Sequence, residues 1–308
     1  MKACIYRRFG APSVLEIGEV DAPERRANFV RVAVHAAALN PKDVLLRKGK
    51  MRLLGTRLPM IPGYDIAGVL LDDADDLKAG TEIFGMIQSH QGGGCAEVAR
   101  LPVNLVARKP ESLTMTEAAS IPLASLTAFQ ALRDDLGVQQ GQHVLLNGAS
   151  GGVGTLAVQI AKVMGATVTA VCSGSNESLV KSLGADRVID YTKQVPTNEH
   201  NLDHVFDIYG SLPWKKAKPM LKPAGRYCTA IPKADTIVRA GLQRLGLHRA
   251  AMVMVQSRRR DLEQVCSWID AGKIKPVIDR TLPLDEASEG HKHLETRRAR
   301  GKVVLKIR

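Results

Sequence analysis

A glycine-rich turn between two segments of different periodicity constrains the fold most. Residues 143–147 (HVLLN) form an apolar run of strand length, and residues 155–165 (TLAVQIAKVMG) carry apolar side chains at helical spacing. The turn between them reads NGASGGVG, with Ala149, Gly151 and Gly154 at the spacing of a dinucleotide-binding fingerprint whose first position is alanine. Glycines there let the backbone approach a pyrophosphate closely, and the N–H groups at the helix N-terminus stabilise its negative charge. The flanking strand and helix favour this interpretation over a simple tight turn.

Strand-like and helix-like segments continue to alternate after this turn. We expect one helix at residues 178–185, and strands at 167–173, 187–190, 204–210 and 225–230. Alternation on this scale is typical of βαβ units that build a parallel, doubly wound sheet. An α/β domain is therefore predicted for about residues 121–258.

The segments on either side of this domain have a different pattern. Residues 1–120 contain short alternating runs, such as 30–34 (VRVAV), separated by glycines and with few helix-period stretches. They predict a compact β-rich domain. Residues 259–308 predict one helix at 261–272 and a final strand, KVVLKI, at 302–307.

The end of the strand at 167–173 bears on which dinucleotide binds. Sites for NAD usually place Asp or Glu about 20 residues after the glycine turn, to bind the ribose 2′-hydroxyl. Here the strand ends VCSGSN at 171–176, and no acid precedes Glu177. Small hydroxyl and amide groups can donate hydrogen bonds to a 2′-phosphate, whereas a carboxylate repels it. NADPH is therefore favoured over NADH, unless a group that the sequence does not reveal holds the ribose.

Composition excludes several classes of protein. The chain has 308 residues, of which 45% are hydrophobic and 24% charged, which is typical of a globular protein of about two domains. No apolar run approaches the ~20 residues that a bilayer crossing needs, and the first residues contain no apolar signal-peptide segment. The five cysteines are scattered and form no C-x-x-C motif. We expect a reducing, cytoplasmic location.

Positive charge is concentrated in one segment. The chain carries 43 Lys and Arg against 31 Asp and Glu, a net +12, and residues 215–260 contain twelve of those basic residues but only one acid, Asp235. An alternative function is therefore binding to nucleic acid or to an anionic membrane surface. Trp214 and Tyr227 are the only aromatic residues in or directly beside the segment, which is unlike an interleaved nucleic-acid platform.

Several motifs, in the same order, resemble one family. They include AALNPKDVLLRKG (37–49), LPMIPGYDIAGVL (58–70), NGASGGVG, KSLGADRVIDY (181–191) and ARGKVVLKI (299–307). Over essentially its whole length the chain resembles the zinc-independent quinone oxidoreductases of the medium-chain dehydrogenase/reductase superfamily. The stretch 168–191 is especially similar to the branch with the reticulon-interacting mitochondrial and the chloroplast-envelope quinone oxidoreductases.

The resemblance implies an α/β protein with two domains. A GroES-like, β-rich catalytic domain is expected from residues 1–121 and 259–308, and a Rossmann NADPH-binding domain from 122–258, with the active site in the cleft. The family is commonly dimeric, so a homodimer is expected. Zinc-dependent members have a cysteine where this chain has Asn40, a histidine where it has Tyr64, and a four-cysteine lobe that this sequence lacks. We therefore expect no metal.

The resemblance also assigns cofactor-binding residues. Asn40 and Thr127 match positions near the nicotinamide and its ribose. The matching pyrophosphate positions are Ser150, Gly151, Gly152 and Val153, and those around the adenosine 2′-phosphate are Ser173, Asn176 and Tyr191. Relatives have lysine in place of Asn176, so a weaker hold on the phosphate is expected. From the residues alone, Asn40 also fits a turn before proline, Thr127 a packed helix position and Tyr191 a half-buried strand position.

Without a metal, the expected reaction is one that the nicotinamide runs nearly alone. The resemblance implies hydride transfer from NADPH to a quinone or to the β-carbon of an enone, with the protein orienting the reactants and stabilising the oxyanion. Asn40 and Tyr64 are the candidate catalytic residues. Tyr64 is the candidate proton donor, and the alternative is that it only packs while water gives the proton. Enoyl-thioester reduction is an alternative activity, although the tyrosine expected after NP-x-D is missing from KGKM at 48–51.

Part of the basic segment mixes basic and apolar residues. Arg239, Arg244 and Arg249 recur every five residues, so on a helix they do not share the single face that a basic membrane helix requires. We expect residues 237–256 to form a partly mobile loop–helix lid beside the nicotinamide end of the cleft. Its apolar side chains are expected to face an apolar acceptor, and its arginines to attract anionic ligands.

Overall fold

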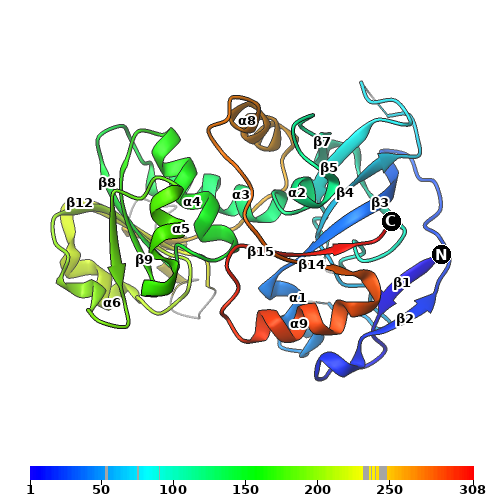
Figure 1. Cartoon of the computed structure of the whole chain (residues 1–308), viewed down its shortest axis with the longest axis horizontal. Helices are drawn as coiled ribbons and strands as arrows, with labels where there is room; N and C mark the ends of the chain where they lie inside the picture. The colour runs from blue at the N-terminus through cyan, green and yellow to red at the C-terminus, as the bar shows by residue number, and fades with distance from the viewer. Residues whose placement is uncertain are drawn as a thin grey trace. The chain divides into compact units, whose positions relative to one another are not determined.

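The computed structural model (Figure 1) describes residues 1–52, 55–74, 76–89, 91–231, 236, 238–239, 241–242 and 248–308. The chain divides into two compact units. The first unit comprises residues 1–123, 256–272 and 276–308, and the second unit residues 124–255 and 273–275. The boundaries predicted from the sequence, after residues 121 and 258, lie within two and three residues of these divisions, and 273–275 groups with the second unit.

A parallel sheet forms the second unit. Within the described residues it has six strands in the order β10-β9-β8-β11-β12-β13, and every neighbouring pair is parallel. The strands are β8 (His143–Asn147), β9 (Thr167–Cys172), β10 (Arg187–Asp190), β11 (Leu202–Asp207), β12 (Leu221–Thr229) and β13 (Ala250–Met252). From β8 the chain adds β9 and β10 towards one edge of the sheet, and it then returns to add β11, β12 and β13 towards the other edge. Open α/β sheets bind ligands at the point between β8 and β11 where the order of addition changes direction. The predicted doubly wound parallel sheet is confirmed.

Helices precede and connect these strands. They are α3 (Pro122–Gln130) with a π-helical continuation (Ala131–Leu136), α4 (Gly152–Val163), α5 (Glu177–Ser182) and α6 (Trp214–Ala217). α4 packs on β8 and β9, and it buries its apolar positions Leu156 and Ile160 there. It begins three residues before the predicted segment, because the last glycines of the turn form its first turn.

The first unit is built mainly from antiparallel strands. β1 (Lys2–Ile5) pairs with β2 (Glu16–Glu19), and a larger sheet has the order β14-β15-β3-β4-β5-β7, with β6 also paired to β3. The larger sheet contains β3 (Phe29–Leu39), β4 (Asp65–Leu70), β5 (Glu82–Met86), β6 (Val98–Pro102), β7 (Val106–Arg108), β14 (Ile278–Pro283) and β15 (Lys302–Lys306). β15 lies antiparallel to β3, with Val303 opposite Leu39. The end of the chain therefore completes the N-terminal sheet, as the resemblance implied.

The helices of the first unit correct one prediction. They are α1 (Pro41–Arg47), α2 (Met115–Ala119), α8 (Arg259–Asp270) and α9 (Ala287–Glu295). The prediction of one helix after residue 259 is wrong, because α9 follows α8. The buried face of α9 consists of Ala287, Gly290 and His291, so it carries no periodic pattern of large apolar residues. A Cβ on Gly290 would lie 2.7 Å from Leu39 Cδ1, which shows how closely α9 approaches β3.

None of the described helices is both long enough and apolar enough to span a bilayer.

Candidate active site

Asn40 lies where β3 ends and α1 begins, as the N-cap of α1. The Asp43 carboxylate accepts hydrogen bonds from the backbone N–H of Asn40 at 2.8 Å and from that of Gly63 at 2.7 Å. Burial raises the pKa of Asp43 to about 6, and these two N–H donors oppose the rise. The carboxylate therefore ties the start of α1 to the turn that precedes β4.

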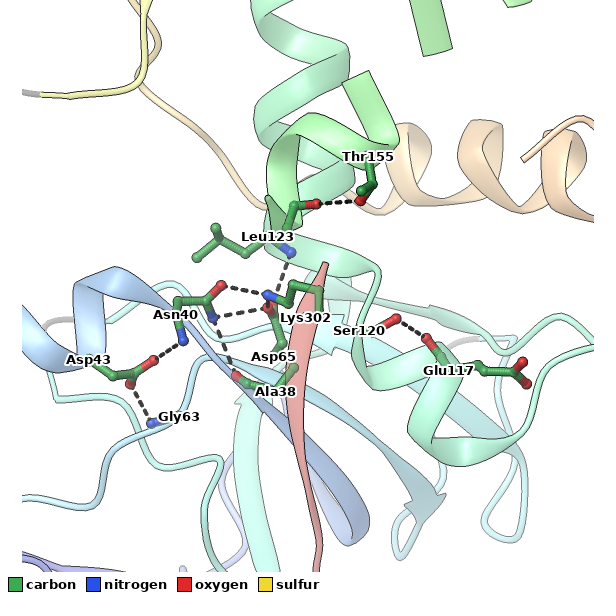
Figure 2. A network of polar contacts seen from close by, with 11 residues as sticks. Ala38, Asn40, Asp43, Gly63, Asp65, Glu117, Ser120, Leu123, Thr155 and Lys302 are labelled. Atoms are coloured by element: carbon green, nitrogen blue, oxygen red, sulfur yellow. Dashed lines mark hydrogen bonds and ion pairs between the residues drawn. The ribbon is translucent and has the colours of Figure 1, made fainter. Parts of the chain in front are cut away.

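The Asn40 side chain belongs to a buried polar network (Figure 2). Its Nδ2 donates to Asp65 Oδ2 at 3.0 Å and to the Ala38 carbonyl at 3.3 Å, and its Oδ1 accepts from Lys302 Nζ at 2.6 Å. Lys302 Nζ also donates to Asp65 Oδ2 at 2.9 Å, and Asp65 Oδ1 accepts from the Leu123 N–H at 2.7 Å. Both amide hydrogens of Asn40 are engaged, so the network holds this side chain in one orientation.

Sequence reasoning selected Asn40 but missed its two charged partners. Asp65 is fully buried and Lys302 is 5% exposed. Each lies in a motif quoted for the resemblance, GYD and GKVVL, and that was the available signal. The catalytic and cofactor roles of Asn40 stay predictions, since what the structure places around it is this network.

Tyr64 lies directly before β4, in the core of the first unit. It is fully buried, and its hydroxyl has no hydrogen-bond partner among the residues that the structure describes. Burial raises the pKa of the phenol, and the negative charge of Asp43 raises it further. Tyr64 packs in the core of the first unit, and both alternatives, proton donor or packing beside the cofactor, stay predictions.

Lys42, the second residue of α1, contacts Tyr64 from above its ring. Its Nζ lies 3.7 Å from the ring centroid, and the side chain is half-buried. Burial lowers the pKa of Lys42, against the raising effect of Asp43 and Asp65. Sequence reasoning did not select this lysine, although it occupies the variable position of the NP-x-D motif.

The glycine turn of the second unit is close-packed at two positions. Gly148 has a φ of +94°, in the left-handed region that favours glycine. A Cβ on Gly154 would lie 2.1 Å from the Gly148 carbonyl oxygen, so the first turn of α4 packs directly on the preceding loop. The predicted pyrophosphate positions Ser150, Gly151, Gly152 and Val153 are all half-buried at the N-terminus of α4. The N-cap of α4 is Gly151, which has no side chain that could cap the first N–H groups, so these groups are suited to an anion.

The structure brings three of the predicted cofactor residues together. Asn176 Nδ2 donates to Ser150 Oγ at 3.0 Å and to Ser173 Oγ at 3.1 Å, and Ser173 Oγ lies 3.0 Å from Ser175 Oγ. Asn176 Oδ1 is buried and has no partner in the described part of the chain. A buried acceptor without a donor, beside hydroxyls and a helix N-terminus, fits the hydroxyl and phosphate groups of a nucleotide. We call Ser150, Ser173, Ser175 and Asn176 the hydroxyl cluster.

Tyr191 and Thr127 are placed differently from each other. Tyr191 follows β10, and its N–H donates to the Cys172 carbonyl at 3.1 Å, so it lies beside the end of β9. Its side chain is 59% exposed, which corrects the half-buried alternative and leaves the ring free to stack. Thr127 is buried in α3, which agrees with the alternative that it occupies a packed helix position. The ligand contacts of both residues stay predictions.

One acidic residue near the hydroxyl cluster was missed. A Cβ on Gly174 would lie 2.4 Å from Asp190 Oδ2, so this carboxylate, at the end of β10, adjoins the loop after β9. Asp190 Oδ1 accepts from the Thr192 hydroxyl at 2.7 Å and from the Thr192 N–H at 3.0 Å. These hydrogen bonds lower the pKa of Asp190. Asp190 is thus a candidate for the ribose-binding group that the sequence does not reveal. The pairing of β10 with β9 brings it next to the loop after β9.

Candidate metal ligands are not grouped in the described ranges. No cluster of three or more His, Cys, Asp or Glu side chains suited to a metal ion occurs within them. The two positions that the resemblance matches to zinc ligands hold the amide of Asn40 and the phenol of Tyr64. Neither group is a thiolate or imidazole ligand of the kind that zinc prefers.

Comparisons with known proteins agree with both units. Residues 26–111 match the family model for the alcohol dehydrogenase GroES-like domain, and residues 183–305 match the model for zinc-binding dehydrogenases. The chain is 36% identical to a tomato (Solanum lycopersicum) 2-methylene-furan-3-one reductase over 99% of its own length and 79% of that protein. It is 31% identical to the chloroplast envelope quinone oxidoreductase homolog of Arabidopsis thaliana, over 99% and 98% of the two chains.

A solved structure extends this likeness to three dimensions. The quinone oxidoreductase of Coxiella burnetii superimposes with a TM-score of 0.91 at 32% identity, covering 100% of this chain and 99% of that one. The expected GroES-like and Rossmann architecture is confirmed by these matches. The chain belongs to the quinone oxidoreductase family of the medium-chain dehydrogenase/reductase superfamily.

Proposed function

We propose that this chain is an NADPH-dependent oxidoreductase that transfers hydride to a quinone or to an α,β-unsaturated carbonyl compound. The observation that carries the proposal is the hydroxyl cluster beside the N-terminus of α4 on a Rossmann sheet. The tomato relative is named for a 2-methylene-furan-3-one, which is an α,β-unsaturated ketone, and the chloroplast relative is named for a quinone. Enoyl-thioester reduction remains the alternative within the same reaction class.

The second unit supplies the cofactor site in this proposal. The turn from Ser150 to Val153 and the N–H groups of α4 bind the pyrophosphate. The Ser173 hydroxyl, which accepts from Asn176 Nδ2 and is oriented by it, donates to the 2′-phosphate. The buried Asn176 Oδ1 accepts from a ribose hydroxyl, and the exposed Tyr191 ring packs on the adenosine. When bound, NADPH supplies hydride from its dihydronicotinamide ring.

The first unit supplies residues for the acceptor. Asn40 is held in one orientation by Asp65 and Lys302, and a side chain locked in this way positions a ligand without losing further conformational entropy. Asn40 Oδ1 has one remaining acceptor site after it binds Lys302. Asn40 and Tyr64 occupy the positions of zinc ligands in zinc-dependent relatives, so we propose that the reaction needs no metal.

Binding of nucleic acid or membranes has less support as a second function. Arg259 pairs with Asp76 at 2.6 Å and with Glu263 at 2.8 Å. Arg249 donates to backbone carbonyls of β12. Part of the positive charge in the basic segment at 215–260 is therefore used in contacts within the protein. The predicted lid at 237–256 falls partly on residues 237, 240 and 243–247, which lie outside the described residues. Within the described part, Ala250–Met252 form β13, a buried strand paired with β12, so the lid prediction is wrong for that end of the segment.

NADPH oxidation, followed by absorbance, tests the proposed function. The acceptor panel contains quinones, enones, enals and enoyl thioesters, and turnover with a quinone or an enone is expected. Fluorescence titration with NADPH and NADH tests cofactor choice, and NADPH is expected to bind more tightly because no carboxylate ends β9. Failure of every acceptor, or a preference for NADH, contradicts the proposal.

Three properties of the enzyme complete the proposal. We propose a metal-independent homodimer located in the cytoplasm, on the basis of the family resemblance and of five cysteines with no disulfide-like spacing. Activity should survive dialysis against a chelator, and sedimentation should give twice the mass of the chain. Stoichiometric zinc together with chelator-sensitive turnover contradicts the metal independence.

A further inference from the structure

Lys42 is a half-buried cation on an aromatic ring. Its Nζ lies 3.7 Å from the centroid of Tyr64, which is fully buried. A cation over a tyrosine face is attracted by the ring quadrupole, and the contact fixes the position of an otherwise flexible side chain. α1 sets the other end of the side chain, because Lys42 directly follows the Asn40–Pro41 pair that starts the helix.

Asp43 and Asp65 are the carboxylates whose negative charge acts on Lys42, and both already accept hydrogen bonds from other donors. Asp43 accepts from the N–H groups of Asn40 and Gly63, and Asp65 accepts from Lys302, the Asn40 amide and the Leu123 N–H. Within the described ranges no hydrogen bond or ion pair joins either carboxylate to Lys42. An ammonium group carries three donors, and here its one described polar contact is the ring.

A partly desolvated cation without an anion is unfavourable unless something binds to it. Burial also lowers the pKa of Lys42, which brings its proton closer to release at neutral pH. The group therefore has the two properties of a general acid for a developing oxyanion, namely unpaired positive charge and a transferable proton.

We propose that the Lys42 ammonium stabilises the oxyanion of the reduced acceptor and then donates the proton that completes the reduction. This inference rests on the proposed function. Hydride from the cofactor forms the new C–H bond at the β-carbon, and the electron pair of the C=C bond shifts so that the carbonyl oxygen becomes an enolate. A proton from Lys42 Nζ then neutralises the enolate oxygen to give an enol, which tautomerises to the saturated ketone by moving that proton to the α-carbon through water. The neutral amine regains a proton from water. Tyr64 serves in this account as the ring on which the ammonium rests, in place of the donor role predicted for its hydroxyl.

The first test needs no cofactor. 4-Nitrophenol is the probe, because its anion has the charge of an enolate oxygen and is distinguished from the neutral phenol by its visible absorbance. The wild-type protein should increase the fraction of anion at a pH near the pKa of the free probe. Lys42→Met should abolish this increase, and Lys42→Arg should keep it, because the guanidinium retains the positive charge. Lys306→Met is the matched control, since Lys306 is an exposed lysine of β15 in the same unit.

The second test separates charge from proton transfer. With an enone acceptor, Lys42→Met should lower kcat about 100-fold, within the range typical of a lost general acid. Lys42→Arg should have a kcat at most tenfold higher than that of Lys42→Met. Arginine restores the positive charge, but it stays protonated at neutral pH and so cannot donate the proton. The basic limb of the wild-type pH profile of kcat/KM should disappear in both variants. The dissociation constant for NADPH should stay within twofold of wild type in both.

The outcomes of these tests distinguish the inference from the proposed function. A wild-type protein that reduces no acceptor overturns both. Wild-type turnover that Lys42→Met leaves within threefold, or an unchanged nitrophenol spectrum on wild-type protein, overturns the role of Lys42 and leaves the proposed function intact. A basic limb that persists in Lys42→Met but is lost in Tyr64→Phe assigns the proton to the tyrosine and also overturns the inference.

Discussion

Replacing Lys302 by methionine should destabilise the protein by about 3–5 kcal/mol, the usual cost of breaking a buried ion pair from one side. The Lys302 side chain is 5% exposed and that of Asp65 is 0% exposed. The ammonium makes two hydrogen bonds, at 2.9 Å to Asp65 and at 2.6 Å to Asn40. Hydrogen bonds to charged groups contribute about 1.5–3 kcal/mol each, so two such bonds give about 3–6 kcal/mol, which includes the range above. Methionine has a similar length, so the loss reflects the missing charge more than an empty volume.

Denaturant unfolding of the full chain measures this loss, and a double-variant cycle identifies its cause. In Lys302→Met the Asp65 carboxylate stays buried without its cation. Adding Asp65→Leu removes that unpaired charge, so the double variant should be more stable than the sum of the two single losses predicts. Lys306→Met, a change of the same kind at an exposed position of β15, should cost less than about 0.5 kcal/mol. A loss below about 1 kcal/mol in Lys302→Met, or additive losses in the cycle, refutes this reasoning.

Three further predictions concern the second unit and pH. Gly154→Ala should weaken NADPH binding more than tenfold or cost about 1–3 kcal/mol, because its Cβ would lie 2.1 Å from the Gly148 carbonyl. Ser173→Asp should shift preference towards NADH, because a carboxylate there repels the 2′-phosphate and accepts from a free hydroxyl. Burial and a nearby guanidinium lower the pKa of His291 from 6.5 to about 3, so the unfolded chain binds this proton more readily. Stability from this group should fall as pH drops from about 6.5 to 3, by at most about 1.4 kcal/mol per pH unit, and His291→Asn should lose this dependence. Asp43, whose pKa is raised from 3.8 to about 6, acts in the opposite direction between those values, so the difference between wild type and His291→Asn is the quantity to measure.

Each of these has a clear negative result. For Gly154→Ala it is wild-type stability together with wild-type affinity for NADPH. For Ser173→Asp it is an unchanged ratio of the NADPH and NADH dissociation constants. For His291→Asn it is a pH slope of unfolding equal to that of wild type between about pH 3 and 6.5.

The sequence by itself predicted five of the six described strands of the α/β unit to within four residues, and it missed β13, which lies in the segment predicted as a lid. β8 and β10 have the predicted bounds, and β9 differs by one residue. These elements were predictable because apolar periodicity, strand length and glycine turns are local properties of the chain. The same reasoning missed α9, because its buried face is made of small residues whose burial depends on the close approach of β3.

The motifs also identified the family and part of its site. Ser150, Ser173 and Asn176 were selected from a glycine turn and a strand end, and the fold brings them into hydrogen-bond contact. Their grouping follows from a general property of parallel sheets, in which the carboxyl ends of neighbouring strands meet at one edge.

Only the tertiary structure decided how the charged groups are paired. Lys302 and Asn40 are 262 residues apart and meet because β15 pairs with β3. Asp190 reaches the loop after β9 because β10 lies next to β9, and Lys42 rests on Tyr64 because the turn before β4 is tied to α1. Strand neighbours are chosen by the packing of the whole unit, in which most buried polar groups find partners, and no local pattern in one sequence records that choice.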